Sequence, residues 1–401
     1  MLTGLYPSRV GTTCNGVEMP EDMPHLATYC KAAGYTTANI GKLHFTNHAS
    51  RDHSKPHHPY DFDTLILSDE PGCYDDDYIK WVRETAPDHL ENCRCSTPPA
   101  WTGIPIVKQA RNTHEPYTFE APDHLTHSAF VAQKSIEFLK RQNENQPFLL
   151  ICGFFAPHPP LNPPRKFLEL YNPDELALPV RLADENYENL DDVHWRKVKQ
   201  HYYALVSNVD EEAGKILKTL KDTGLHDNTI IVFTSDHGEY LGDHGMIQKG
   251  PPGLDSCIHV PLIISGPGIA EKGRFEPGLI EAVDLLSTLL DSCHIPIPDR
   301  LQGNSFKPIL EKVDGGRRES IYVEFMQPGG ESWKTIRTSE HKYCLSSTGE
   351  ELMFDLRDDP GELYDIAVHP RYDQVKRWLK DKLLERWFGV ENQYPQKTGA
   401  Y

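Results

Sequence analysis

The 401-residue sequence lacks several features that would place it in common protein classes. It has no apolar run long enough to cross a membrane as a helix, so we expect no membrane span. Its nine cysteines include no Cys-x-x-Cys pair, which argues against a zinc ribbon. Basic residues are also few, with 41 Lys and Arg against 59 Asp and Glu, a formal net charge of −18. A nucleic-acid-binding protein needs a basic face, so we expect no nucleic-acid partner.

What is present suffices for a folded protein. Hydrophobic residues make up 38% and aromatic residues 10% of the chain, which is enough to build a core. The length fits one large α/β domain plus a smaller one. The acidic balance does not exclude an anionic substrate, because a metal ion or a few cationic side chains reverse the sign of the charge inside a pocket.

Short apolar runs alternate with helical periodicity over the first two-thirds of the chain. Three of these runs are nearly continuous and predict strands buried in a sheet. This alternation predicts a mostly parallel sheet with flanking helices, an α/β fold. The expected strands are 36–40, 148–155, 230–234 and 261–265, and the expected helices are 24–33, 123–142, 192–222 and 283–290.

The pattern changes near Gly315-Gly316, where short strands of half-buried type begin. We predict an α/β domain over residues 1–315 and a small antiparallel α+β subdomain over residues 316–401. The subdomain is expected to have strands at 321–325, 334–337, 342–346 and 352–355 and a helix at 372–388. Residues 45–118 are rich in His, Pro, Asp and Cys with little periodicity, which predicts a long excursion over the site.

Polar clusters directly follow three of the expected strands. Lys42 and His44 follow the first, His158 follows the second, and Asp236 and His237 follow the third. In open α/β sheets, ligands bind beyond the carboxyl ends of the strands. If these strands are neighbours, the clusters converge there.

Each cluster alone also has an ordinary structural explanation. Lys42 and His44 fit a solvated strand end, and His158 fits a rigid loop between prolines. Asp236 fits a helix N-cap with His237 beside it, although a carboxylate next to an imidazole is also half of a metal site.

Two further polar segments lie downstream. Lys249 lies in the sequence Gln248-Lys249-Gly250, where a lysine is more often an exposed surface residue than a ligand-binding one. Asp243 and His244 repeat the Asp-His-Gly pattern, and we interpret them as supporting or structural residues.

Taken together and in this order, the motifs resemble the sulfatase family of the alkaline-phosphatase-like superfamily. The resemblance covers nearly the whole chain. Its segments are MLTGLYPSRVG at 1–11, GKLHF at 41–45, FFAPHPP at 154–160, TSDHGEYLGDHG at 234–245, KG at 249–250, HVPLIISGPG at 259–268 and FDLRDDPGEL at 354–363.

The resemblance implies a sulfuric ester hydrolase acting on a sulfated small molecule or glycan, such as a sulfated carbohydrate or an aryl sulfate. Family members use a formylglycine, made from Cys or Ser, as the nucleophile. A divalent cation, Ca²⁺ or Mg²⁺, holds the sulfate and the nucleophile. Asp236 and His237 fall on positions of its ligands.

The same resemblance implies roles for four cationic or titratable residues. Lys42 and His44 fall on the pair that supports the formylglycine, with His44 placed to deprotonate the sulfated intermediate. His158 falls on a sulfate contact that protonates the leaving alcohol, and Lys249 falls on a second sulfate contact. Sulfuryl transfer needs positive charge directed at the sulfate oxygens and a proton donor that titrates near neutrality.

The sequence departs from the family at the nucleophile. The signature is Cys/Ser-x-Pro-Ser-Arg, and its nearest imitation, Leu5-Tyr6-Pro7-Ser8-Arg9, has Leu at the reactive position. Aligning Thr3-Gly4 with the family pattern puts the nucleophile, and a strand bearing paired Asp ligands, before residue 1. We therefore expect residues 1–401 to be inactive by themselves. A phosphonate or phosphate monoester hydrolase of the same superfamily and a non-catalytic anion-binding remnant are the alternatives.

Overall fold

The computed structural model describes residues 1–46, 56–72, 74–94, 115–185, 190–327 and 329–391. The chain forms two compact units. We name them after the strands that the described residues form: the three-strand unit holds residues 27–230 and 240–248, and the six-strand unit holds residues 1–26, 231–239 and 249–401. The sequence-based division at residue 315 stays a prediction.

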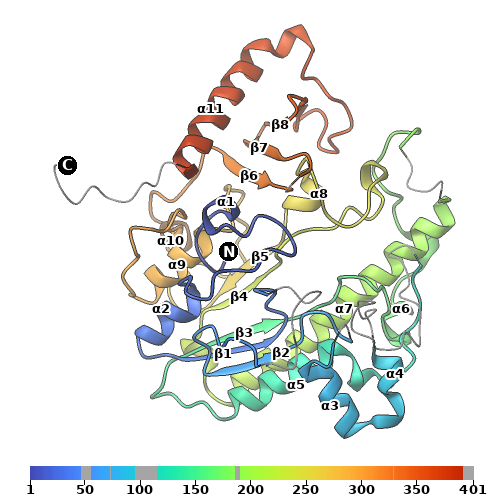
Figure 1. Ribbon diagram of the computed structural model, residues 1–401, viewed down its shortest axis with the longest axis vertical. Coiled ribbons are helices and arrows are strands. Elements are labelled where there is room, and N and C mark those ends of the chain that lie inside the picture. Colours follow the sequence, from blue (N-terminus) through green and yellow to red (C-terminus); the bar gives the residue numbers. More distant parts are fainter. Residues whose placement is uncertain (47–55, 73, 95–114, 186–189, 328, 392–401) are drawn as a thin grey trace. The chain divides into compact units, whose positions relative to one another are not determined.

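The three-strand unit is built on a parallel sheet of order β2-β1-β3. Its strands are β1 (Thr36–Gly41), β2 (Thr64–Leu67) and β3 (Phe148–Gly153). Gly41 lies opposite both Leu67 and Gly153, so the three strands end together at one edge. Helix α5 (His127–Leu139) packs on β1 and β3, and α3 (Asp77–Thr85) packs on β2 (Figure 1).

Local sequence explains where three of the helices begin. The side chains of Asp76, Thr126 and Asp191 cap α3, α5 and α7 (Asp192–Asp222) by accepting a backbone N–H from the first turn. Helix α7 buries Trp195, Val198 and Leu205 against Leu161 and Leu241. Its apolar stripe therefore supplies much of the core of this unit.

The six-strand unit contains two antiparallel sheets. Strands β4 (Ile231–Thr234) and β5 (Leu262–Ser265) form a pair. Strands β6 (Ile321–Phe325), β7 (Trp333–Arg337), β8 (His341–Ser346) and β9 (Glu351–Asp355) form a meander. Helix α11 (Asp373–Glu391) covers this meander and buries Leu379 and Leu383 (Figure 1).

The shorter α-helices of the described residues connect these elements. They are α1 (Pro7–Val10), α2 (Leu26–Ala32), α4 (Leu90–Cys93), α6 (Arg165–Leu168), α8 (Asp255–Ile258), α9 (Asp284–Ser292) and α10 (Lys307–Leu310). No helix among the described residues is long and apolar enough to cross a membrane.

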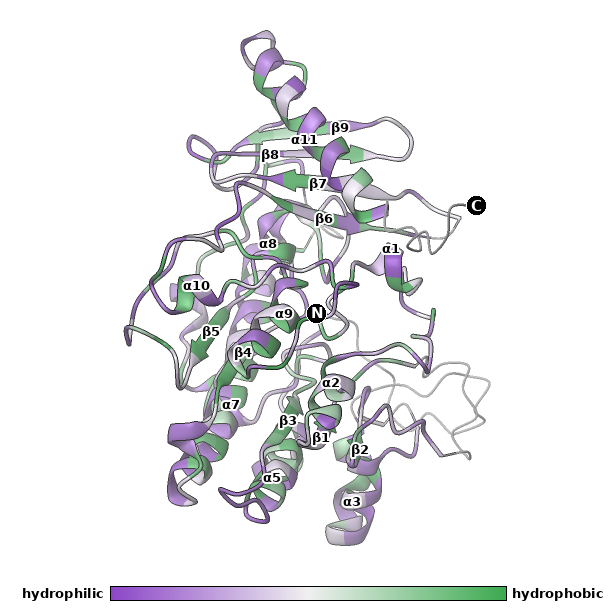
Figure 2. Cartoon of the chain, turned by 90° about the vertical axis from the view of Figure 1, so that its left-hand side faces the viewer, coloured by the Kyte–Doolittle hydropathy of each residue, from purple (hydrophilic) through white to green (hydrophobic). Residues whose placement is uncertain are grey.

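The predicted parallel α/β sheet and the C-terminal antiparallel sheet are confirmed, but the predicted burial of three strands is wrong. Strands β4 and β5 are hydrophobic (Figure 2), yet Phe233 is 41% and Ile263 is 62% exposed. Strand β3 is half-buried along its length. Among the described residues β4 and β5 pair only with each other, and a two-stranded sheet leaves a face and an edge uncovered.

The predicted excursion over residues 45–118 is only partly irregular. It contains β2, which is part of the parallel sheet, and helix α3, which packs on that strand. Residues 47–55, 73 and 95–114 of this segment lie outside the described residues.

Candidate active site

Lys42 directly follows β1 and lies against the end of β3. Its backbone N–H donates a 2.7 Å hydrogen bond to the carbonyl oxygen of Gly153. A Cβ built on Gly153 would lie 2.0 Å from the Lys42 carbonyl oxygen, a distance no side chain tolerates. Glycine at 153 is therefore required for this close approach.

Asp69 holds the turn that carries His44. Its Oδ1 accepts hydrogen bonds from the backbone N–H groups of Leu43 at 2.6 Å and His44 at 2.8 Å. Asp69 is 1% exposed, and His44 has a left-handed φ of 58°. A buried carboxylate accepting two N–H groups fixes this turn strongly. Asp69 was not predicted from the sequence, because the strand that it follows, β2, was not predicted either.

His158 lies in the loop after β3, and its ring is oriented by the backbone. Its Nδ1 lies 2.8 Å from the carbonyl oxygen of Pro159. A carbonyl only accepts, so Nδ1 carries a proton and donates it to this bond. The ring of Phe155 packs against His158, with centroids 4.6 Å apart.

A third histidine lies near this edge. His127 begins α5, is buried, and contacts the rings of Tyr78 and Phe155. Burial, with a smaller contribution from the positive charge of Lys42, lowers the pKa of His127 to about 3. His127 is therefore neutral at pH 7. It was not predicted from the sequence as a residue of the site.

The structure thus places Lys42, His44 and His158 at the ends of the neighbouring parallel strands β1 and β3, as the sequence predicts. Their chemical roles remain predictions. Asp243 also lies in this unit, where its Oδ1 accepts a hydrogen bond from the backbone N–H of Val180 at 2.8 Å. That contact fits the structural role expected for it.

Asp236 and His237 follow β4 in the six-strand unit. The Asp236 carboxylate accepts a hydrogen bond from the His237 N–H at 3.1 Å, and its Oδ2 lies 3.7 Å from His237 Nε2. His237 Nδ1 lies 2.8 Å from the Gly238 carbonyl oxygen, so Nε2 is the nitrogen suited to a metal. No helix begins here, so the alternative interpretation as an N-cap is wrong.

These two residues fit only part of a metal site. In the part of the chain that the structure describes, no group of three His, Cys, Asp or Glu side chains is arranged to hold a metal ion. Calcium takes six to eight oxygen ligands, and Mg²⁺ demands an octahedral set. The described donors are therefore an incomplete ligand set for either ion.

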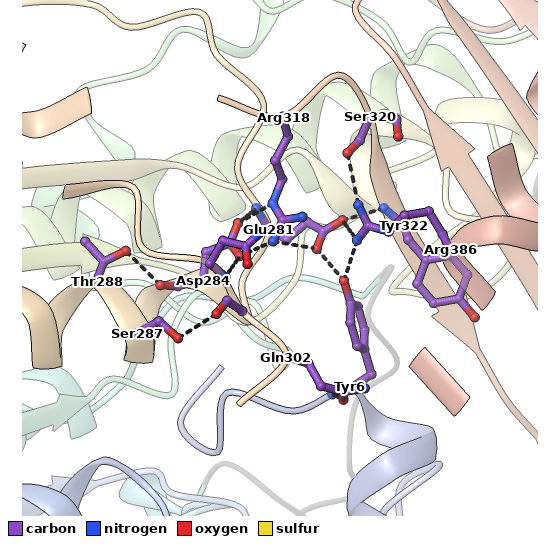
Figure 3. A network of polar contacts seen from close by, with 12 residues as sticks. Tyr6, Glu281, Asp284, Ser287, Thr288, Gln302, Arg318, Ser320, Tyr322 and Arg386 are labelled. Atoms are coloured by element: carbon purple, nitrogen blue, oxygen red, sulfur yellow. Dashed lines mark hydrogen bonds and ion pairs between the residues drawn. The ribbon is translucent and has the colours of Figure 1, made fainter. Parts of the chain in front are cut away.

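Residues 1–11, which carry the first motif, are anchored in the six-strand unit by a buried polar network (Figure 3). The Tyr6 hydroxyl donates to Glu281, and Arg386 Nη2 donates to Glu281 at 2.6 Å and to Tyr6 Oη at 2.8 Å. Arg318 pairs with Asp284 in the same network. Burial and then the charge of Glu281 raise the pKa of Tyr6, which stays protonated.

Two backbone contacts extend this anchoring. The Ser8 N–H donates to Glu324 at 2.7 Å. The side chain of Gln302 accepts from the Tyr6 N–H at 3.0 Å, and its backbone N–H donates to the Gly4 carbonyl at 2.9 Å. The segment is thus held at three alternate residues.

A parallel sheet flanked by helices, together with a small antiparallel sheet under a C-terminal helix, is the arrangement found in the alkaline-phosphatase-like fold. Within it, the chain belongs to the sulfatase family. The family model "Sulfatase" matches residues 1–295, and the model "N-sulphoglucosamine sulphohydrolase, C-terminal" matches residues 242–387. The chain is therefore a sulfatase by family.

Curated relatives agree with this assignment. An arylsulfatase of Clostridium perfringens is 30% identical, over 92% of this chain and 79% of that protein. A choline-sulfatase of Rhizobium meliloti is 29% identical, over 92% of this chain and 72% of that protein.

Solved structures share the fold. The phosphonate monoester hydrolase of Agrobacterium radiobacter superposes with a TM-score of 0.81 at 24% identity, covering 97% of this chain and 85% of that one. A protein solved in complex with its substrate D-glucosamine-2-N,6-O-disulfate superposes with a TM-score of 0.76 at 22% identity, covering 99% and 88%. At these identities the likeness shows the fold alone.

Proposed function

We propose that the protein acts on sulfate monoesters, of an aryl alcohol or of a carbohydrate, and that Lys42, His44 and His158 form its reacting edge. The observation that carries this proposal is the turn after β1, which the Gly153 carbonyl and the Asp69 carboxylate fix on two sides. A fixed turn leaves the backbone that carries Lys42 and His44 little freedom to reorganise. Such preorganisation is what stabilises a developing anionic transition state.

In this proposal each residue has one task. Lys42 and Lys249 contact sulfate oxygens and offset their negative charge. His158 transfers the proton on Nε2 to the leaving alcohol oxygen as the ester S–O bond breaks and sulfur bonds to a nucleophile that these residues do not supply, while its Nδ1–H stays bonded to the Pro159 carbonyl. His44 accepts the proton that releases sulfate from the enzyme.

We further propose a divalent cation, Ca²⁺ or Mg²⁺, with Asp236 and His237 as two of its ligands. When bound, the cation supplies positive charge to the sulfate oxygens. Among the described residues no group of three such donors is arranged to hold a metal, so these two would need further ligands.

The nucleophile is the part of the family machinery that residues 1–401 do not encode. Leu5 stands at the reactive position of the only segment that imitates the signature, and Leu cannot become formylglycine. We therefore propose that this chain by itself binds sulfate esters without turning them over. Sustained release of nitrophenol from 4-nitrophenyl sulfate by purified 1–401 would refute this point.

Phosphonate or phosphate monoester hydrolysis is the second candidate, because a phosphonate monoester hydrolase shares the fold of this chain. Calorimetric titration of the chain with 4-nitrophenyl sulfate, 4-nitrophenyl phosphate and a phenylphosphonate monoester separates the two. We expect the sulfate ester to bind most tightly. Tighter binding of either phosphorus ester would favour the second candidate, and no binding of any ester would contradict both.

A further inference from the structure

A fully buried lysine ties the C-terminal sheet to the segment after Lys249. Lys342 lies on β8 and is 0% exposed. Its Nζ forms ion pairs with Asp255, at 2.6 Å, and with Glu362, and it donates a 3.1 Å hydrogen bond to the Gly253 carbonyl. A buried ammonium is tolerated only with such compensation.

Asp255, the first residue of α8, is the centre of this cluster. Arg337 of β7 donates to both of its carboxylate oxygens, at 3.0 and 2.9 Å. The Asp255 N–H donates to Glu362 at 2.6 Å. Burial alone would raise the pKa of Asp255, but the bonds from Arg337 and Lys342 lower it to about 2. Thr335, also on β7, donates to the Pro252 carbonyl at 2.6 Å.

Helix α8 in turn contacts the segment after β4. The Gly238 N–H donates a 2.7 Å hydrogen bond to the Cys257 carbonyl. A Cβ on Gly238 would lie 2.1 Å from the Ser256 carbonyl oxygen, so the two backbones touch. Gly238 directly follows Asp236 and His237, so a displacement of α8 displaces these residues.

We propose that the Lys342–Asp255–Glu362–Arg337 cluster positions two candidate site segments, residues 235–238 and the segment that begins at Lys249. Lys342 and Glu362 are then positioning residues, which act through α8 and contact no substrate. Glu362 lies in the FDLRDDPGEL segment, one of the segments that resemble the sulfatase family. The positioning role gives a physical reason for a glutamate at this place in the segment. The proposal rests on the proposed function for the role of Lys249.

The test compares Glu362→Ala and Glu362→Gln with a matched control, Glu351→Ala. Glu351 lies on β9 of the same sheet and accepts from Tyr343, Lys376 and Lys380 at 2.8, 3.2 and 2.6 Å. Its removal weakens the sheet through α11 rather than through α8.

The measurement is hydrogen exchange at the Gly238 amide, read by NMR under conditions where exchange occurs through local opening. Loss of the charged acceptor in Glu362→Ala should accelerate this exchange about tenfold to a hundredfold. Glu362→Gln keeps an oxygen for the Asp255 N–H and should restore most of the protection. Glu351→Ala should leave the exchange rate of the Gly238 amide unchanged, even where it lowers the global free energy of unfolding as much as Glu362→Ala does.

Equal acceleration in Glu351→Ala and Glu362→Ala would overturn the proposal, as would unchanged exchange in Glu362→Ala. If Glu362→Ala fails to fold, Arg337→Ala takes its place, because it removes two hydrogen bonds to the Asp255 carboxylate, and Gly238 exchange identical to wild type in that variant overturns the proposal. Titration with 4-nitrophenyl sulfate separates the positioning role of the cluster from the proposed function. Faster Gly238 exchange in a protein that never binds the ester refutes the proposed function and leaves the positioning role standing.

Discussion

Removing Glu281 should be among the most destabilising single changes in the six-strand unit. Its side chain is 4% exposed and accepts from Tyr6, from Arg386 at 2.6 Å and from the Tyr322 N–H at 2.7 Å. Breaking a buried ion pair by removing one partner costs about 3–5 kcal/mol. Arg386 is 26% exposed and recovers some hydration, so we expect a loss near the lower end of that range.

The assay is urea unfolding at pH 7 of wild type, Glu281→Ala and Glu281→Gln. Glu281→Gln keeps one acceptor oxygen and should lose about half as much free energy of unfolding as Glu281→Ala. Asp222→Ala is the control, because it removes an ion pair with Lys218 in which both side chains are more than half exposed, and its effect should stay within about 0.5 kcal/mol. A loss below about 1 kcal/mol in Glu281→Ala would refute the network as an anchor of residues 1–11.

Three further outcomes follow from the three-strand unit. Asp69→Ala leaves the Leu43 and His44 N–H groups without their acceptor, so it should destabilise the protein by about 2–4 kcal/mol and shift the His44 ring resonances, whereas Asp69→Asn should do less of both. Burial raises the Asp76 pKa from 3.8 to about 7, so the folded state keeps this proton to higher pH than the unfolded state, and the free energy of unfolding falls as the pH rises from about 4 to 7. Between these pH values the free energy of unfolding of Asp76→Asn, measured by urea unfolding, should rise relative to that of wild type by up to about 4 kcal/mol. A difference between the two proteins that does not change with pH would contradict the pKa shift. Burial lowers the His127 pKa from 6.5 to about 3, so the free energy of unfolding falls as the pH drops below 6.5. Between pH 7 and pH 4, His127→Phe should therefore lose less free energy of unfolding than wild type does.

Local sequence signals predicted the elements closely. The predicted strand 36–40 corresponds to β1, and the helix predicted at 192–222 corresponds to α7. The four short strands predicted after Gly316 correspond to β6, β7, β8 and β9. These elements depend on patterning and caps that lie within a few residues of each other, which a sequence displays directly.

Burial and long-range partners were not predictable in the same way. The run at 261–265 has the composition of a buried strand, but whether such a strand is covered depends on what pairs with it. Asp69 acts on backbone groups 25 and 26 residues upstream, so no local pattern marks it. Lys342 looks like any surface lysine in the sequence, and only the placement of Asp255 and Glu362 makes its burial possible.

The most direct test of the proposed sulfate site is calorimetric titration of purified 1–401 with 4-nitrophenyl sulfate, repeated with Lys42→Ala and Lys249→Ala. We predict saturable binding to wild type that each substitution weakens by about tenfold, the equivalent of about 1.4 kcal/mol. Glu351→Ala should bind as wild type does. The absence of binding to wild type, or wild-type affinity in both lysine variants, would contradict the account.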